Sequence, residues 1–224
     1  VGSEQSDIEL YVIDTDEKTH VSVIADSICT PSGQLVTALR ENRGYLEKLL
    51  PYVGEADPVE CREDDVILIT GGLGGIGVAV AEELLAAQPK AKLLLMSRSC
   101  NGKAPYLNRV SSLQNEGYTI RVLEGDVTDR GSLSAVLDLI RKEYGSPDIV
   151  IHGAGIAGDG MLVHKDWDTA RSVLRPKMDG TVLLDCLTRQ DRLRAMILFS
   201  SFTSAVGAPG QTDYTAANAF LDAF

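Results

Sequence analysis

The stretch VILITGGLGGIG at Val66–Gly77 decides the fold, because a continuous apolar run leads directly into a glycine-rich turn. An uninterrupted apolar run is typical of a strand buried on both faces of a parallel sheet. The glycines would let the backbone turn tightly and approach a pyrophosphate, with the start of the next helix facing the phosphates. Because a strand precedes the turn and a helix follows it, the stretch predicts a dinucleotide-binding site.

The same alternation continues along the chain after this stretch. Apolar strands are expected at 92–97, 119–125, 148–155 and 195–201, and helices at 76–87, 107–116, 132–144 and 166–188. Parallel strands need long connections, which are usually helical. The pattern therefore predicts an α/β fold, a Rossmann-like doubly wound parallel sheet that binds ligands at the carboxyl ends of its strands.

The first 60 residues follow a different pattern. Short runs of Val, Ile, Leu and Tyr at 9–16, 20–27 and 34–41 favour strands, whereas 42–52 fits a strand or a short helix. The acidic segment 54–65 is expected to be a linker. We therefore divide the chain into a small β-rich fragment with its linker at 1–60 and a nucleotide-binding subdomain at 61–224.

Composition limits the classes of function. The chain has 224 residues, of which 44% are hydrophobic, and its net charge of -11 argues against a nucleic-acid partner or an anionic membrane surface. Its apolar runs are too short to span a membrane, and the N-terminus lacks the apolar core of a signal peptide. The four cysteines are scattered without the spacing of a metal or disulfide site, so we expect reduced thiols, no metal and a cytoplasmic location.

The cofactor site is expected to draw on several strand ends. After the second strand stands Arg98, where an NAD site would have a carboxylate; its guanidinium suits the 2′-phosphate of NADPH, with a solvated arginine as the alternative. Asp126 is expected to bind the adenine amino group, to cap the next helix with Thr128, or both, and His152 to be structural. The predicted cofactor-binding residues are Thr70, Gly71, Gly72, Leu73, Gly74, Gly75, Ile76, Gly77, Ser97, Arg98, Asp126, Val127, His152, Ala154 and Gly155.

A second polar group, Ser201, Tyr214 and Asn218, follows the last predicted strand. If these side chains converge on one carbonyl oxygen, the hydroxyl would polarise a ketone and the phenol would protonate the alkoxide left by hydride transfer. A free tyrosine has a pKa of about 10, so a nearby lysine ammonium would make proton transfer easier. Lys177 is the nearest candidate, although its spacing alone favours an ordinary exposed lysine.

From about Val66 to Phe224 the chain resembles the ketoreductase domains of modular polyketide synthases, in the short-chain dehydrogenase/reductase superfamily. The matching runs are TGGLGGIG, SRS, GDVTD, HGAGIAGDGML, RPKMDGT and FSS…GQTDYTAANAFLDAF. Ordinary members of the superfamily have lysine four residues after the tyrosine. Synthase ketoreductases exchange the positions, as Lys177 and Asn218 do here. The first 50 or so residues look similar to the tail of the structural subdomain that precedes such domains.

The resemblance implies NADPH-dependent reduction of the β-ketone of an acyl chain carried as a thioester on an acyl carrier protein, next to neighbouring synthase domains. It implies that Tyr214 donates the proton and that Ser201 holds the carbonyl oxygen. Lys177 would assist Tyr214 and bind the nicotinamide ribose, and Asn218 would support the site.

Two motifs sort such domains by the configuration of their product. One type has a Leu-Asp-Asp-like motif after the fourth strand, and the other has a tryptophan eight residues before the tyrosine. Here the first motif reads Ala157-Gly158-Asp159, and Val206 stands at the tryptophan position. The retained Asp159 favours the first (B) type, which forms a D-configured hydroxyl.

Two other functions remain open at this point. One is a ketoreductase-like domain that is redox-silent or epimerising, against which the complete set around Tyr214 speaks. The other is a stand-alone reductase of a free small molecule, against which the upstream Lys177 and the N-terminal fragment speak. Since ten residues follow Tyr214, we expect the sixth and seventh strands and the substrate lid of such folds to lie outside this sequence, as in a piece of a longer polypeptide.

Overall fold

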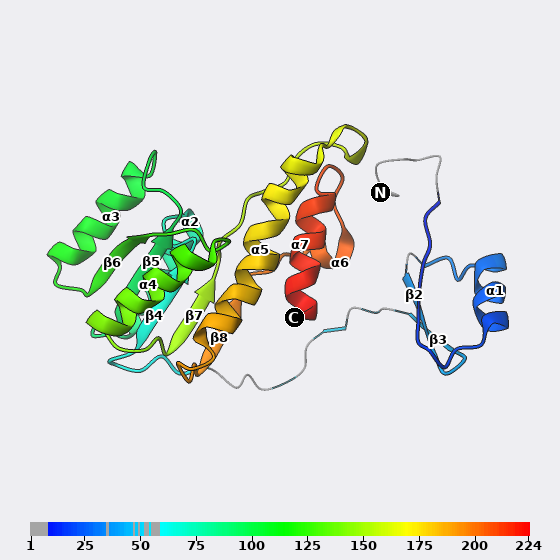
Figure 1. The fold of residues 1–224 in the computed structure, drawn as a ribbon, viewed down its shortest axis with the longest axis horizontal. Helices are drawn as coiled ribbons and strands as arrows, with labels where there is room; N and C mark the ends of the chain where they lie inside the picture. Colours follow the sequence, from blue (N-terminus) through cyan, green and yellow to red (C-terminus); the bar gives the residue numbers. More distant parts are fainter. Residues whose placement is uncertain (1–8, 35, 47, 49, 52–53, 55–58) are drawn as a thin grey trace. The chain divides into compact units, whose positions relative to one another are not determined.

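Figure 1 shows a computed structural model of the chain, in which residues 9–34, 36–46, 48, 50–51, 54 and 59–224 are described. The chain divides into two compact units, Val1–Asp57 and Pro58–Phe224, and each is considered by itself. The expected linker at 54–65 lies partly outside the described residues, as do parts of the segments 34–41 and 42–52.

The smaller unit contains a three-stranded sheet and one helix. Its elements are β1 (Val12–Thr15), α1 (Val21–Cys29), β2 (Val36–Arg40) and β3 (Arg43–Leu46). The strand expected at 20–27 is wrong, because this segment forms α1. The reason lies in the pairing: β1 and β2 are parallel, so the chain between them must cross over rather than turn back, whereas β2 and β3 are antiparallel and follow one another directly.

The larger unit is built on a five-stranded sheet in the order β6-β5-β4-β7-β8, with every neighbouring pair parallel. The strands are β4 (Val66–Thr70), β5 (Lys92–Ser97), β6 (Ile120–Glu124), β7 (Ile149–His152) and β8 (Ala195–Leu198). The helices are α2 (Gly75–Ala87), α3 (Ala104–Asn115), α4 (Arg130–Glu143), α5 (Trp167–Thr188), α6 (Thr203–Val206) and α7 (Thr212–Ala223), with a 3₁₀ turn η1 (Leu162–His164). The predicted doubly wound α/β fold is confirmed. The strand order reverses between β4 and β7, which is where such sheets open a ligand crevice.

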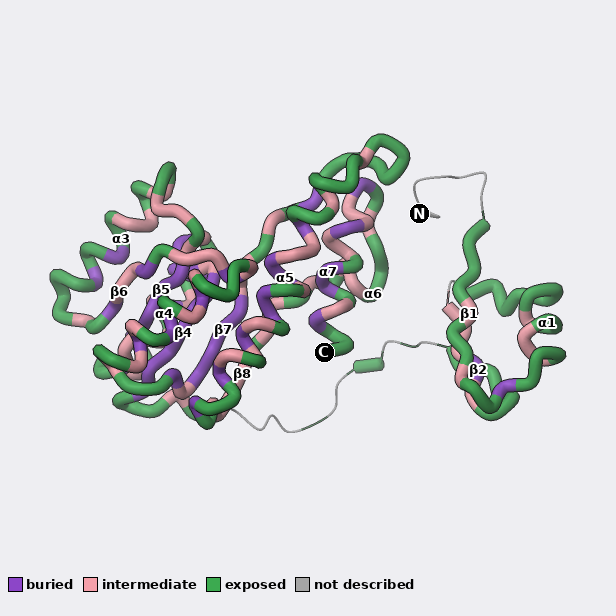
Figure 2. Tube along the Cα trace, viewed as in Figure 1, coloured by how far each residue is buried: buried purple, intermediate pink, exposed green. Residues whose placement is uncertain are grey.

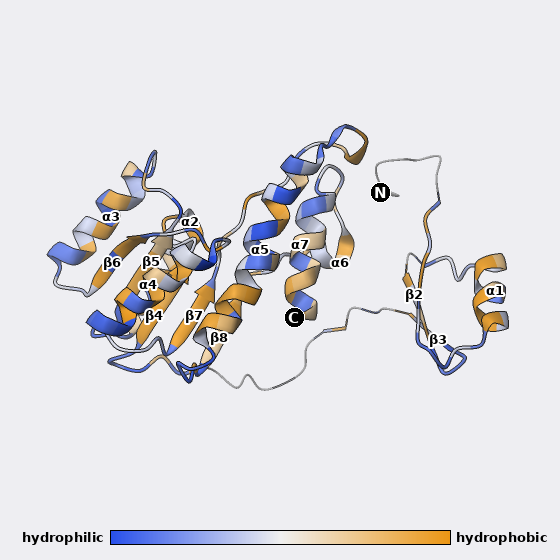
Figure 3. Ribbon diagram, viewed as in Figure 1, coloured by the Kyte–Doolittle hydropathy of each residue, from blue (hydrophilic) through white to orange (hydrophobic). Residues whose placement is uncertain are grey.

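Two hydrophobic layers enclose the sheet (Figures 2 and 3). Ile67 and Ile69 of β4 pack with residues of α2 and α3, while Leu68 packs with residues of α4 and α5 on the opposite face. Each such fully buried side chain contributes about 1.5–3 kcal/mol. Because both faces are covered, β4 is buried along its whole length. In Figure 1, α7 lies alongside α5.

The turn after β4 is fixed by close backbone packing. Gly71 has φ +70°, which disfavours other residues, and a Cβ there would lie 2.7 Å from the carbonyl of Gly153. A Cβ on Gly72 would lie 2.8 Å from Leu95 Cα on the neighbouring strand. These contacts hold the start of α2 directly above the strand ends.

Within the part of the chain that the structure describes, no helix is both long and apolar enough to cross a membrane. Nor do His, Cys, Asp and Glu side chains gather there in a group that could hold a metal ion.

His152, the last residue of β7, is fully buried and links three elements. Its Nε2 lies 3.0 Å from the carbonyl oxygen of Pro176 in α5, and its Nδ1 lies 2.6 Å from Thr70 Oγ1 in β4. A carbonyl oxygen only accepts, so Nε2 carries the proton and Nδ1 accepts from the Thr70 hydroxyl. Burial, aided by the Lys177 ammonium, lowers the pKa of His152 to about 4. The imidazole is therefore neutral and acts as a brace.

This lowered pKa predicts acid sensitivity. Between pH 6.5, the pKa in the unfolded chain, and pH 4, the approximate pKa in the folded chain, His152 is protonated in the unfolded chain and neutral in the folded one. Because of His152, the free energy of unfolding is highest above pH 6.5. It falls by about 3 kcal/mol as the pH decreases from 6.5 to 4. In urea unfolding we expect wild type to lose about that much more than His152→Asn over this range.

The exposed His164 provides the control, since His164→Asn should keep the pH dependence of wild type. Equal losses in wild type and in His152→Asn would contradict the assignment.

Candidate cofactor and active site

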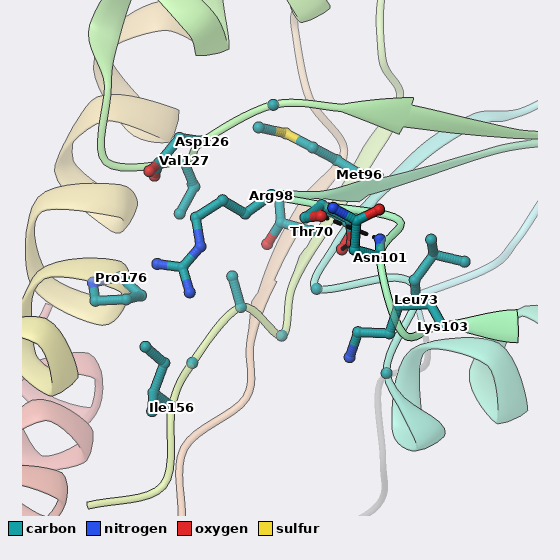
Figure 4. A pocket seen from close by; sticks show the side chains of 18 residues that line it. Thr70, Leu73, Met96, Arg98, Asn101, Lys103, Asp126, Val127, Ile156 and Pro176 are labelled. Carbon is teal, nitrogen blue, oxygen red and sulfur yellow. Dashed lines mark hydrogen bonds between the residues drawn. The ribbon is translucent and has the colours of Figure 1, made fainter.

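A cavity of about 310 Å³ lies at the carboxyl ends of the strands, beside the turn after β4 (Figure 4). Of the predicted cofactor-binding residues, the lining includes Thr70, Gly71, Leu73, Gly74, Ser97, Arg98, Asp126, Val127, Ala154 and Gly155. These residues come from four separate strand ends, so the topology brings together what the sequence holds far apart.

The other predicted cofactor residues, Gly72, Gly75, Ile76, Gly77 and His152, lie outside the lining. Gly72 and Gly77 are buried beneath the turn, where they allow it to pack, and His152 is buried behind it. The lining further includes Met96, Ser99, Asn101, Lys103, Gly125, Gly153, Ile156 and Pro176. No sequence signal marks Pro176, which arrives from α5. Lys103 could have been predicted from the sequence, because it is a cation in the loop after the second predicted strand.

Charged side chains of both signs surround the cavity. The Arg98 side chain is exposed and extends into the cavity in Figure 4. Asp126 Oδ1 accepts from the Thr128 amide and hydroxyl, both at 2.8 Å. The capping expected of Asp126 is instead performed by Asp129, whose side chain accepts from the Ser132 amide at the start of α4. Asp126 therefore shapes the turn before the helix.

Lys177 lies between this cavity and α7. Its side chain is buried, so the exposed lysine favoured by spacing alone is wrong. The ammonium donates to the Phe199 carbonyl at 2.6 Å and lies 5.9 Å from the centroid of the Tyr214 ring. A Cβ on Gly155, in the cavity wall, would lie 3.1 Å from Lys177 Cε. Lys177 therefore packs behind Gly155 of the cavity lining, and its ammonium faces the ring of the predicted proton donor.

Asp222, an exposed acid of α7 that the sequence analysis did not single out, acts on Lys177 from beyond ion-pair distance. Burial lowers the pKa of Lys177, and the Asp222 carboxylate opposes this shift. The neighbouring Ser200 and Ser204 hydroxyls, together with the Lys177 charge, lower the pKa of Asp222. Asp222 stands two helical turns after Tyr214, so the spacing i, i+4, i+8 on one helix face was the available signal.

Asn218 and Ser201 complete the predicted set. Asn218 is fully buried, and its Nδ2 donates to the Tyr214 carbonyl at 2.7 Å, while its Oδ1 has no partner among the described residues. Ser201 follows β8, and its Oγ accepts from the Thr203 amide at 3.3 Å. The neighbouring Ser200 hydroxyl donates to the Asn218 carbonyl at 3.3 Å. Tyr214 is therefore linked to Asn218 by a hydrogen bond and faces the Lys177 ammonium, whereas the Ser201 hydroxyl is hydrogen-bonded to Thr203 in its own turn.

The two predicted stereocontrol residues lie on different segments. Asp159 is exposed in the loop after β7, where its Oδ1 accepts from the Gly160 amide at 2.7 Å. Val206, at the end of α6, is 54% exposed. Asp159 lies close to Gly210, since a Cβ on that glycine would be 3.9 Å from Asp159 Oδ1. The Asp159 loop therefore borders the turn that leads into α7.

Comparison with known proteins agrees with this arrangement. A family model described as the KR domain matches residues 66–224. Polyketide synthase ThaG of Burkholderia thailandensis is 36% identical over 163 residues, which are 73% of this chain and 3% of that protein. The pikromycin polyketide synthase component PikAII of Streptomyces venezuelae is 38% identical over 162 residues, 71% of this chain and 4% of that protein. The chain thus spans a small part of the length of these relatives.

Solved structures agree as well. A ketoreductase domain from the bacillaene assembly line matches with a TM-score of 0.85 and 27% identity, over 100% of this chain and 54% of that one. An N-terminal ketoreductase from the macrolactin assembly line matches with the same score and identity, over 99% of this chain and 45% of that one. The chain therefore belongs to the KR family, the ketoreductase domains of modular polyketide synthases within the short-chain dehydrogenase/reductase superfamily.

Proposed function

We propose that the chain reduces the β-ketone of a polyketide thioester, carried on an acyl carrier protein, to a β-hydroxyl with NADPH. The observation that carries the proposal is the buried Lys177 ammonium, which contacts the cavity wall at Gly155 and faces the Tyr214 ring. A buried cation between a nucleotide cavity and a phenol favours proton donation beside a hydride donor. Family membership supports the same reaction class.

The charges and the small residues of the cavity lining suit a phosphorylated dinucleotide. The start of α2 directs free backbone amides toward the Gly74 side, as a pyrophosphate requires. Arg98 and Lys103 place two cations in the lining, which suits the 2′-phosphate of NADPH better than the hydroxyl of NAD. Gly153, Ala154 and Gly155 leave the wall near Lys177 without bulky side chains. When bound, NADPH supplies the hydride.

The chain's own residues supply the proton and the orientation. Tyr214 gives its phenolic proton to the alkoxide oxygen, and the Ser201 hydroxyl orients that oxygen beforehand. Lys177 favours the phenolate left behind, while the Phe199 carbonyl holds the ammonium in place. Asn218 braces the helical turn of Tyr214 through its bond to the Tyr214 carbonyl.

Several finer assignments belong to the same proposal. Asp159 and the absence of tryptophan at Val206 favour the B type, with a D-configured hydroxyl. The neighbouring synthase domains are partners in the same polypeptide, and the reaction takes place in the cytoplasm. The relatives' roles as polyketide synthases support these partners.

Replacement of Tyr214 by phenylalanine tests the proton donor. In the whole polypeptide that carries this sequence, we expect Tyr214→Phe to slow NADPH oxidation by a β-ketoacyl N-acetylcysteamine thioester about 10²- to 10⁴-fold, because the alkoxide loses its proton source. Binding of NADPH, followed by its fluorescence, should be unchanged. Tyr118→Phe, at a half-buried tyrosine packed on the core, is the matched control. If wild type itself oxidises no NADPH, the reductase proposal fails and the redox-silent alternative gains support.

Replacement of Arg98 by alanine tests the choice of cofactor. Loss of a charge-assisted bond of about 1.5–3 kcal/mol should raise the KM for NADPH about 10- to 100-fold. The KM for NADH should stay nearly constant, because NADH has no 2′-phosphate. Arg189→Ala removes an exposed arginine paired with Asp185 and should leave both values unchanged. Equal effects on both cofactors would show that Arg98 acts on the fold and not on the phosphate.

A further inference from the structure

A buried ion pair lies outside the predicted catalytic set. Lys165, between η1 and α5, has its Nζ 2.6 Å from Oδ1 of Asp213 in the first turn of α7, and the two side chains are only 2% and 3% exposed. Lys165 Nζ also lies 3.4 Å from the Gly210 carbonyl oxygen. Burying two charges costs desolvation free energy, so pairs of this kind often contribute little net stability. The pair therefore needs an explanation other than stability.

The same carboxylate oxygen reaches the backbone of Tyr214. Asp213 Oδ1 accepts from the Tyr214 amide at 2.9 Å. This amide is among the first four of α7, which have no partner within the helix. Asp213 Oδ2 is buried without a partner among the described residues, so Oδ1 carries the contacts of this carboxylate. Lys165 is thereby tied, through one oxygen atom, to the residue proposed as proton donor.

The loop that carries Asp159 is packed against this oxygen. Gly158 is buried, and a Cβ there would lie 2.3 Å from Asp213 Oδ1 and 3.2 Å from Tyr214 Cβ. The loop backbone thus fits against the pair with no room for any side chain. A shift of Asp213 would move the Asp159 loop and the start of α7 relative to one another.

We propose that Lys165 and Asp213 are positioning residues that clamp the Asp159 loop against Tyr214 and so select which face of the ketone receives the hydride. The inference rests on the proposed function, in which Tyr214 donates the proton. When the carbonyl oxygen is held at Tyr214, the direction in which the acyl chain lies decides which face of the ketone meets the hydride. The loop at Gly158 borders Tyr214 and so lies where it can influence that direction. Displacement by about 1 Å at such a position can lower a rate 10²-fold.

The test uses Lys165→Met, Asp213→Asn and the double variant in the whole polypeptide. For a β-ketoacyl N-acetylcysteamine thioester, we expect each single variant to lower kcat about 10- to 100-fold, with the KM for NADPH unchanged. The ratio of D to L hydroxyl products, measured by chiral chromatography, should fall at least about tenfold. Because the pair acts as a unit, the double variant should be no worse than the poorer single variant.

The double variant leaves no unpaired buried charge and so protects the test against simple unfolding. Arg189→Met with Asp185→Asn, at a solvent-accessible pair at the end of α5, is the matched control and should leave kcat and the product ratio unchanged. A double variant with the kcat and product ratio of wild type would overturn the proposal.

A second measurement separates this inference from the proposed function. Amide hydrogen exchange needs no turnover, and in Asp213→Asn we expect faster exchange at Tyr214 and at residues 157–160 together, with β4 unchanged. Unaltered exchange at both segments would refute the clamp even in an active enzyme. If wild type is inactive but exchange at both segments rises in the variant, the reductase proposal fails and the clamp stands.

Discussion

The constraint on which the rest of the structure depends is the burial of the three central parallel strands, β5, β4 and β7, from both sides. Parallel neighbours cannot be joined by tight turns, so each connection becomes a helix that covers one face. All strands then end at one edge, and between β4 and β7 the helices leave that edge in opposite directions. The cavity at this edge, the cation-bearing loop after β5 and the small residues after β7 are consequences of that geometry.

The burial of one charge organises the part of the site beyond the sheet. The Lys177 ammonium loses hydration on burial, and the Phe199 carbonyl after β8 replaces part of it. The same ammonium faces the Tyr214 ring of α7, so Lys177 links α5 to the segment after β8 and to α7. With lysine supplied from α5, position 218 is free to hold an asparagine that binds the Tyr214 carbonyl.

Features of the fold that depend on local sequence patterns were predicted best. The strands at 66–70 and 92–97 match because strands of a doubly covered sheet are continuous apolar runs. The helix at 21–29 was missed, since its conformation follows from the parallel pairing of β1 with a strand beyond it. The burial of Lys177 and the role of Asp222 depend on proximity across 20 to 45 residues, which no spacing rule records. The sequence suggested that Asp126 caps α4, but Asp129 does so. Two acids precede this helix, and the sequence alone does not show which of them is the N-cap.

The departure of the Ala157-Gly158-Asp159 segment from its family motif has a physical cause that local sequence conceals. Any side chain at 158 would collide with the carboxylate of Asp213, which occupies the space that an acid there would need. A carboxylate is therefore present beside Tyr214, but it is contributed by α7 and neutralised by Lys165. Position 158 therefore has no room for a side chain while the Asp213 carboxylate holds this place. Under the clamp proposed for Lys165 and Asp213, the configuration of the product depends on both segments together.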